Sequence, residues 1–187
     1  MMAGYGYAPL GNAPGNPTTT AQLNISTAAS IAQNYVSQLN DPNLKVAQVE
    51  EYTQNFYVQI VEKNTGVGAF EQLINKYTGA LSPEPGPNMM WNTKYGMMST
   101  GMMGLYATAP TATMPVNATQ AAANAQQYLN SYYAGTKVGD VTTFYGYFTI
   151  EVLQGGTTYG MISVNGYTGQ VWYHTWHGTF IAEQQVS

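Results

Sequence analysis

The sequence predicts an α+β protein of two tandem repeats, each with one helix packed on an antiparallel meander sheet of about four strands. Three observations predict this fold class: an internal duplication, a helical pattern at the start of each copy, and an alternating pattern after it. The duplication shows as three matches in the same order, whose spacing drifts only slightly, as changes in loop length would produce. The matches are NISTAASIAQNYVSQL from Asn24 with NATQAAANAQQYLNSY from Asn117, 93 residues apart; KVAQVEEYTQNFYVQIV from Lys45 with KVGDVTTFYGYFTIEVL from Lys137, 92 apart; and NKYTGAL from Asn75 with NGYTGQV from Asn165, 90 apart.

Each copy is expected to begin with an amphipathic helix. Ser26 and Thr119 occupy equivalent positions and are the predicted N-caps. Apolar residues then recur at the i, i+3, i+4 and i+7 spacing of one helical face. NDPN from residue 40 and AG from residue 134 are expected to end the two helices. The predicted core-facing residues are Ala28, Ile31, Ala32, Tyr35, Val36 and Leu39 in the first copy, and Ala121, Ala125, Tyr128, Leu129 and Tyr132 in the second.

Strands are predicted after each helix, because apolar and polar residues alternate there with a period of two. Such a pattern describes a sheet covered on one face, and the helix is the expected cover. Residues 69–74 and 159–164 supply a third strand, and residues 75–79 and 165–169 form the turns into a fourth. The expected core-facing strand residues are Phe56, Val58 and Ile60 in the first copy, and Phe148, Ile150 and Val152 in the second.

A helix followed by a meander whose last turn reads N-x-Y-T-G resembles the PepSY domain, and both copies carry the pattern. The resemblance covers residues 24–96 and 117–180. Its most specific elements are the two YTG turns, followed by ALSPEPGPNMMWNTKYG in the first copy and QVWYHTWHG in the second. It implies an extracytoplasmic, non-catalytic module that binds or inhibits partners such as proteases, and no catalytic residue is carried over. The expected organisation is a tail over 1–23, a first repeat over 24–96, a linker rich in Met, Gly and Thr over 97–115, and a second repeat over 116–187.

The composition argues against a nucleic-acid-binding protein. Charged residues make up 7% of the chain, where about 25% is typical, and the net charge is −4 with five lysines and no arginine. There is no cysteine, and no apolar run is long enough to span a membrane. The first residues look like the start of a mature chain from which a leader was removed, so we expect an extracellular or cell-surface location. The sequons at Asn24 and Asn117 are candidate glycosylation sites there.

The leading functional hypothesis is a structural protein that associates with copies of itself. A surface made of Thr, Asn, Gln, Ser and Tyr carries little charge repulsion, which favours association. The first 20 residues are rich in Gly, Pro, Asn and Tyr and cannot form a core of their own. Addition of this tail to an open sheet edge of a neighbouring copy would build a filament.

The competing hypothesis is an extracytoplasmic metal-binding protein. His174 and His177 are the two histidines of the chain, and imidazole and thioether ligands suit copper. Non-covalent haem is a further option. Against a ligand role, the duplication predicts Asn92 and Tyr95 as counterparts of the two histidines, at a spacing of 82, which favours a structural role instead. Gap-filling between domains is the alternative role for the methionines. The candidate sulfur ligands are Met89, Met90, Met97, Met98, Met102 and Met103.

Catalysis is not expected, because the chain carries no G-x-S-x-G elbow, no H-E-x-x-H motif and no phosphate-binding glycine loop. Glu50 and Glu51 are adjacent in a predicted strand, so their side chains point to opposite faces. The second copy has Thr142 and Thr143 at these positions. Both carboxylates are therefore expected to be solvated charges.

Overall fold

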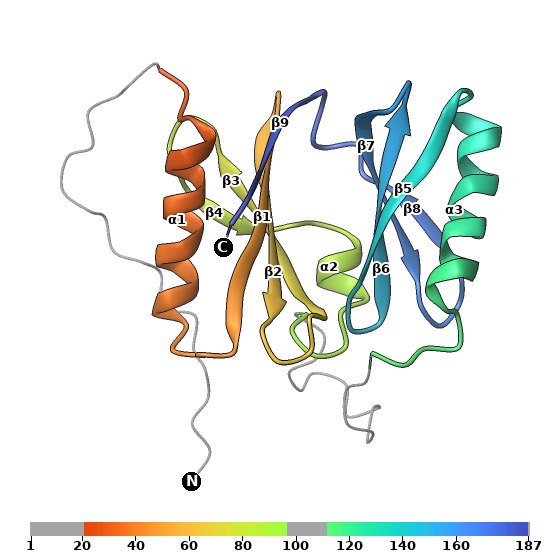
Figure 1. The fold of residues 1–187 in the computed structure, drawn as a ribbon, viewed down its shortest axis with the longest axis horizontal. Helices are drawn as coiled ribbons and strands as arrows, with labels where there is room; N and C mark the ends of the chain where they lie inside the picture. The colour runs from red at the N-terminus through yellow and green to blue at the C-terminus, as the bar shows by residue number, and fades with distance from the viewer. Residues whose placement is uncertain (1–20, 97–111, 187) are drawn as a thin grey trace, which may run out of the picture.

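The computed structural model describes residues 21–96 and 112–186. Each repeat contributes one long helix and a four-stranded antiparallel meander, which confirms the predicted α+β class with two repeats. In Figure 1 the two sheets lie back to back between their helices, so the layers run helix, sheet, sheet, helix. The first repeat contains α1 (Ile25–Gln38), β1 (Leu44–Tyr52), β2 (Asn55–Glu62), β3 (Gly68–Asn75), β4 (Leu81–Pro83) and the short α2 (Pro87–Met90); the second contains α3 (Ala118–Tyr132), β5 (Thr136–Thr143), β6 (Tyr147–Gln154), β7 (Thr157–Asn165), β8 (Val171–Tyr173) and β9 (Phe180–Gln185).

The helices start two residues earlier than the sequence predicts. Asn24 and Asn117 are the N-caps, in place of Ser26 and Thr119. The Asn24 side chain accepts a hydrogen bond from the backbone N–H of Thr27 at 2.8 Å, and the Asn117 side chain caps α3 in the same way. Asparagine caps a helix as well as serine does, so in each copy the asparagine, which comes first in the chain, is the N-cap. Both sequon asparagines consequently lie exposed at helix N-termini.

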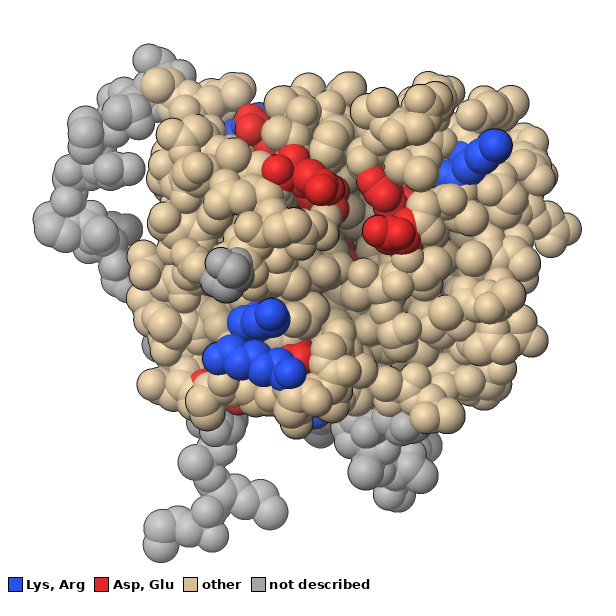
Figure 2. All heavy atoms as spheres, viewed as in Figure 1, with Lys and Arg blue, Asp and Glu red and all other residues tan. Residues whose placement is uncertain are grey.

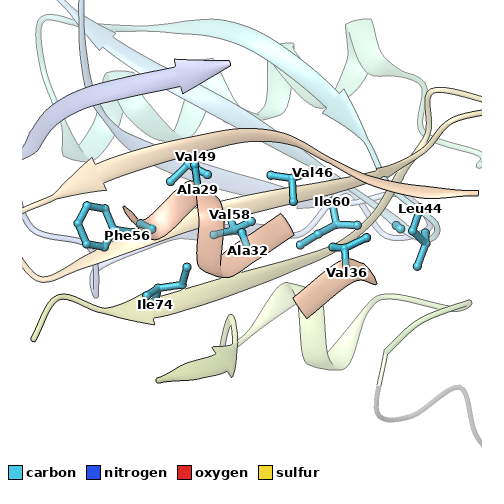
Figure 3. Packing of buried hydrophobic residues seen from close by; sticks show 12 residues of the cluster. Ala29, Ala32, Val36, Leu44, Val46, Val49, Phe56, Val58, Ile60 and Ile74 are labelled. Carbon is cyan, nitrogen blue, oxygen red and sulfur yellow. The ribbon is translucent and has the colours of Figure 1, made fainter. Parts of the chain in front are cut away.

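The predicted helix and strand faces meet in two separate cores, one in each repeat. Figure 3 shows Ala32 and Val36 of α1 beside Val58 and Ile60 of β2. The prediction fails only near the helix C-termini, where Leu39 is 39% exposed and Tyr132 is 71% exposed. Leu39 lies just beyond the end of α1 and Tyr132 is the last residue of α3. Among the described helices, none is long and apolar enough to cross a membrane.

The N-x-Y-T-G turns adopt one conformation in both repeats. Asn75 accepts hydrogen bonds through Oδ1 from the backbone N–H groups two and three residues further on, and Asn165 does the same. Gly79 and Gly169 close the turns at φ of 71° and 73°, in the left-handed region that favours glycine. The equal geometry makes β4 and β8 equivalent strands, so the residues directly after them occupy equivalent places in the two repeats.

The last strand crosses between the repeats. Residues 116–187 are predicted to form the second repeat, but β9 pairs antiparallel with β1 and becomes the edge of the first sheet. The strand orders are β4-β3-β2-β1-β9 and β5-β6-β7-β8. The two repeats are therefore joined both by packing and by a shared sheet.

The sheet faces that no helix covers pack against each other through buried polar side chains. Gln59 of β2 donates to the Thr142 hydroxyl at 2.9 Å, and the Thr149 hydroxyl of β6 donates to Glu71 of β3 at 2.8 Å. The prediction that Glu50 is a solvated charge is wrong, because it is 6% exposed in this layer. Glu51, on the opposite face, forms an ion pair with Lys76. An outer surface with few charges therefore encloses a layer that contains buried acids and hydroxyl groups.

Candidate metal centre between the repeats

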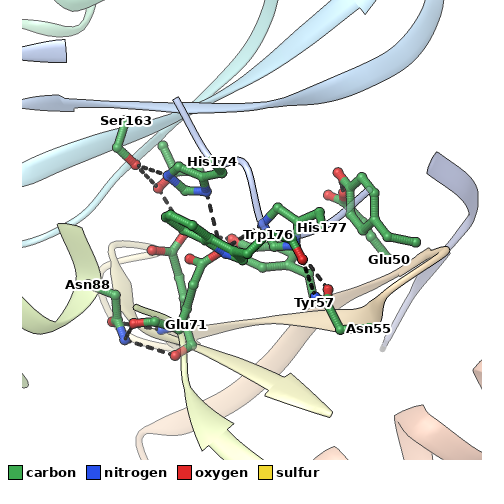
Figure 4. Close-up of polar contacts among 12 residues, drawn as sticks. Glu50, Asn55, Tyr57, Glu71, Asn88, Ser163, His174, Trp176 and His177 are labelled. Carbon is green, nitrogen blue, oxygen red and sulfur yellow. Dashed lines mark hydrogen bonds and ion pairs between the residues drawn. The ribbon is translucent and has the colours of Figure 1, made fainter. Parts of the chain in front are cut away.

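Glu84, His174 and His177 come together inside this polar layer, as Figure 4 shows for the two histidines. Glu84 directly follows β4, His174 directly follows β8, and His177 lies in the segment that leads to β9. The three side chains are 0%, 3% and 1% exposed. The first repeat thus contributes the carboxylate and the second repeat contributes both imidazoles of one enclosed cluster.

Strand register makes Glu84 the counterpart of His174. In the first repeat Ile74 pairs with Leu81, and in the second Val164 pairs with Val171, so the fourth strands are equivalent at a spacing of 90. The residues after them also match, because the Glu84 backbone N–H donates to the carbonyl of Glu71 at 3.1 Å while that of His174 donates to Met161 at 3.0 Å.

This register corrects the predicted pairing of His174 with Asn92. The pairing with Asn92 implies an eight-residue insertion, mostly SPEPGPNM, which contains Glu84, whereas the register keeps the spacing of 90 through Glu84 and places the extra residues after it. The first copy therefore also carries a potential metal ligand, Glu84, at the position of His174. The pairing with Asn92, which argued against a ligand role for His174, no longer applies. Asn92 is buried and donates to the carbonyl of Ala69, and Tyr95 donates its hydroxyl to Glu62.

The nitrogen atoms that face Glu84 come very close to one carboxylate oxygen. His177 Nε2 lies 2.8 Å and His174 Nδ1 lies 3.3 Å from Glu84 Oε1. Despite these separations, neither nitrogen has a hydrogen-bond partner, and Glu84 Oε2 is also buried without one. The distances suit an ion pair, but the angles do not suit a hydrogen bond. His174 Nδ1, His177 Nε2 and Glu84 Oε2 are therefore three potential metal-ligand atoms, close together and without hydrogen-bond partners.

The other nitrogen of each imidazole is fixed by a hydrogen bond. Asn55 donates through Nδ2 to the carbonyl of Trp176 at 2.9 Å, so its Oδ1 is the atom that faces His177 Nδ1 at 2.9 Å. His177 Nδ1 must then carry the proton and donate it. In the neutral ring, Nε2 is left with its lone pair directed at Glu84.

A relay of hydroxyl groups orients His174 in the same way. The Thr149 hydroxyl donates to Glu71 Oε1, so it can only accept from Ser163, whose oxygen lies 3.2 Å away. The Ser163 hydroxyl therefore donates its proton to Thr149, and the Ser163 oxygen accepts a hydrogen bond from His174 Nε2 at 2.9 Å. His174 Nδ1 is left with its lone pair toward Glu84. Second hydrogen bonds of this kind orient the histidine ligands of metal sites.

The charge balance favours a cation at this point. The two imidazoles hold the pKa of the buried Glu84 carboxyl below its ordinary value, against the effect of burial. Burial lowers the pKa of His177, which disfavours the imidazolium that would complete an ion pair with Glu84. The two directions conflict, because the fall in the Glu84 pKa requires protonated imidazoles; the neutral His177 is better supported, because burial favours it and its Nε2 makes no hydrogen bond to Glu84. An ionised carboxylate then faces imidazole lone pairs, an arrangement that a metal ion stabilises.

Aromatic rings enclose the cluster. The Tyr52 ring stacks on His177 with centroids 4.7 Å apart, and the Trp176 ring stacks on His174 at 4.6 Å. Trp176 also donates its indole N–H to Glu84 at 3.1 Å. The walls are thus rigid and largely apolar, and they exclude water from the donor atoms.

The structure brings together only part of the predicted ligand set. His174 and His177 meet, as that hypothesis requires. Met90 is 57% exposed, and Met89 lines a groove of about 520 Å³ on the outer side of the first repeat with Tyr35 and Phe70, so neither joins the histidines. Met97, Met98, Met102 and Met103 lie outside the described residues. Sequence reasoning missed Glu84, Asn55 and Ser163; the signal for Glu84 was its position after the fourth strand, at a spacing of 90 from His174.

Comparison with known proteins adds little. No family model matches the sequence, and no curated protein matches it. One solved structure, the Bacillus megaterium YpeB C-terminal domain, is similar to 80% of this chain at 8% identity and a TM-score of 0.28, and the chain spans 61% of that structure's length. The likeness is too weak to show a family or a shared fold.

Proposed function

We propose that this protein is a non-catalytic, extracytoplasmic binding protein that holds one divalent transition-metal ion between its two PepSY-like repeats. The observation that carries the proposal is the convergence of the buried Glu84 carboxylate with His174 Nδ1 and His177 Nε2, where both nitrogens and Glu84 Oε2 have no hydrogen-bond partner and Oε1 accepts only from Trp176. Structural hydrogen bonds alone would have used these atoms, because leaving buried polar atoms without partners costs about 1–3 kcal/mol each.

The donor atoms define the class of ion. Two imidazole nitrogens and one carboxylate oxygen suit Zn²⁺ and its neighbours Co²⁺, Ni²⁺ and Cu²⁺. Cu⁺ prefers thioether sulfur, and Met89 and Met90, the described methionines of the predicted ligand set, lie elsewhere. The proposal therefore keeps the two histidines of the copper hypothesis and replaces its methionines with Glu84. Haem ligation stays a prediction from the sequence.

A holding role fits the site better than a catalytic one. Catalytic zinc sites keep one coordination position open to water or substrate. Here Glu84 Oε2 is buried beside the other donors and could complete the coordination as the second oxygen of a bidentate carboxylate. The stacked rings of Tyr52 and Trp176 leave the donors enclosed.

The test is metal binding by protein that was stripped with a chelator and dialysed. Zn²⁺ titration followed by elemental analysis should give one ion per chain, and Co²⁺ should give the visible absorption of a four-coordinate nitrogen and oxygen site. His174→Ala with His177→Ala should abolish this binding, and Glu84→Gln should weaken it strongly.

Glu62→Gln is the matched control, because Glu62 is also a buried carboxylate between the repeats but pairs with Lys94. This variant should bind metal like the wild type. If the wild-type chain takes up no stoichiometric metal, or the double histidine variant binds equally well, the proposal is wrong. The Co²⁺ spectrum of the wild type shows whether the metal site exists, even if the double histidine variant does not fold.

The self-associating structural protein remains the other candidate function. Figure 2 shows a face with few charged side chains, and the chain as a whole has 7% charged residues. The N-terminal tail to which the sequence assigns assembly lies outside the described residues. A different segment, the crossing strand β9, favours association and leads to a separate inference.

A further inference from the structure

β9 belongs to one repeat by its place in the chain and to the other by its hydrogen bonds. It pairs with β1 from Gln48–Gln185 to Tyr52–Phe180, and this pairing makes it the edge of the first sheet. The Val186 backbone N–H also donates to the carbonyl of Ala47 in the first repeat at 2.9 Å, while Phe180 packs against a cluster formed by Tyr52, Tyr57 and Met161 of β7. A strand held this way needs a β1 edge, and the β1 edge of any copy of the chain would serve.

The attachment of β9 is shallow. None of its six residues is buried; exposed and partly buried positions alternate along it, and Ile181 is 51% exposed. Phe180 is its main apolar anchor, edge-on against Tyr52 with ring centroids 5.6 Å apart. By contrast, β2 and β3 are mostly buried. Local opening of an edge strand with so little buried surface costs far less than unfolding the domain.

The ladder between β1 and β9 contains a like-charge pair. Glu50 and Glu183 stand directly opposite each other, and acidic side chains at such positions repel. Figure 2 shows acidic groups on both sides of a hollow in the middle of the molecule, on a face with few other charges. A neutral or oppositely charged pair at these two positions would stabilise the pairing of β1 with β9 more than two acids do.

The segment between β8 and β9 can serve as a hinge. It runs from His174 to Thr179 and contains Gly178 at φ of 81°. Two backbone hydrogen bonds tie it to the first repeat, from Thr53 N–H to the Thr179 carbonyl and from Gln54 N–H to the His177 carbonyl, at 2.9 and 3.0 Å. These partners also lie in the repeat that carries β1, so a second copy can offer the same contacts.

We propose that β9 exchanges between copies of this protein, the β9 strand of one chain pairing with the β1 strand of another. Every contact of the exchanged strand is one that the chain already makes with itself, which makes domain swapping a low-cost route to association. Two chains that exchange reciprocally form a closed dimer, and chains that exchange head to tail form an open filament. The proposal does not require metal binding, because β9 itself carries none of the three donor residues; His174 and His177 lie in the hinge segment before it.

Protein concentration decides which pairing forms. A strand on a short linker finds its own sheet at an effective concentration on the order of mM, so exchange requires either comparable protein concentration or refolding in a concentrated solution. Once formed, exchanged assemblies separate only as fast as β9 opens. They should therefore persist for a time after dilution and be visible by size-exclusion chromatography with light scattering.

The test uses a cysteine pair, which is clean because the chain has no cysteine. Gln48 and Gln185 are directly opposite in the ladder, at a separation that a disulfide can bridge. Gln48→Cys with Gln185→Cys, refolded reduced at about 1 mM and then oxidised, should give dimers or larger species joined by interchain disulfides on non-reducing gels. The same variant oxidised first as a dilute monomer should stay monomeric after concentration.

A control pair distinguishes strand exchange from general association. Lys137→Cys with Leu153→Cys joins β5 to β6, neighbouring strands of one hairpin, so its disulfide leaves β9 free. When oxidised as a dilute monomer, this variant should still form dimers after refolding at about 1 mM. The proposal fails if the wild type remains monomeric under these conditions, or if its assemblies form while the Gln48–Gln185 bond stays within each chain.

Discussion

Glu50→Gln offers a quantitative test of the polar layer between the sheets. Glu50 is 6% exposed, and it accepts hydrogen bonds of 2.6 Å from the Tyr52 hydroxyl and from the Gln48 side-chain amide. Burial raises its pKa to about 7, from an ordinary value of 4.5, and the charges of Glu151 and Glu183 add to the rise. The folded protein therefore favours the neutral carboxyl more than the unfolded chain does.

The sign of the effect follows from this difference. At pH values below about 4.5 the carboxyl is neutral in both states, and its favourable contribution to folding is fully present. As the pH rises from about 4.5 to about 7, the unfolded chain ionises first, and that contribution is lost. A rise of this size corresponds to about 3 kcal/mol of unfolding free energy. A glutamine cannot ionise, so Glu50→Gln should be about 3 kcal/mol more stable than the wild type at pH 8, relative to their difference at pH 4.5.

Urea unfolding of both proteins at pH 4.5, 6, 7 and 8, with a chelator present, measures this difference. Glu183→Gln is the control at the opposite position of the ladder; because Glu183 is exposed, its change should stay within about 0.5 kcal/mol. Stability curves that run parallel across this pH range for wild type and Glu50→Gln would refute the reasoning, since they would mean that Glu50 titrates equally in both states.

Three further substitutions test other parts of the fold by the same urea assay. Glu71→Ala should cost about 3–5 kcal/mol, because three buried hydroxyls donate to this carboxylate, while Glu71→Gln should cost clearly less; equal losses would contradict that view. Gly146→Ala should cost more than about 2 kcal/mol, because φ is 100° and the new Cβ would lie 2.1 Å from the Trp91 carbonyl oxygen; a neutral result would mean that this contact is wrong. Asn117→Ala should cost about 1 kcal/mol through loss of the capping box with Gln120, with Thr119→Ala as a control that changes stability much less.

Much of the fold could be predicted from the sequence because the duplication repeats every signal twice. The alternation around Val58 and Ile150 and the turns at Asn75 and Asn165 are local patterns, and the structure places them as expected. The crossing of β9 could not be predicted, because a short alternating segment shows that a strand forms but not which sheet edge it joins.

The candidate site could be predicted only in part for a related reason. The two histidines stand out as the only ones in the sequence, but Glu84 sits in SPEPG, which resembles an ordinary loop. Its role depends on the exact place of an eight-residue insertion, and side-chain similarity placed Glu84 inside that insertion, without a counterpart in the second repeat. Backbone hydrogen bonds, which sequence comparison cannot see, settle the alignment.

Equivalent positions of the two repeats meet at Glu84 and His174, and this has an evolutionary consequence. Two separate copies of a single repeat that met across a two-fold axis could present only identical side chains at this spot, either two acids or two imidazoles. Fusion into one gene released that restriction, so that one half could supply negative charge and the other a neutral base. The asymmetric pair at the centre of the molecule is a chemical option that the fused chain has and a symmetric ancestor could not have had.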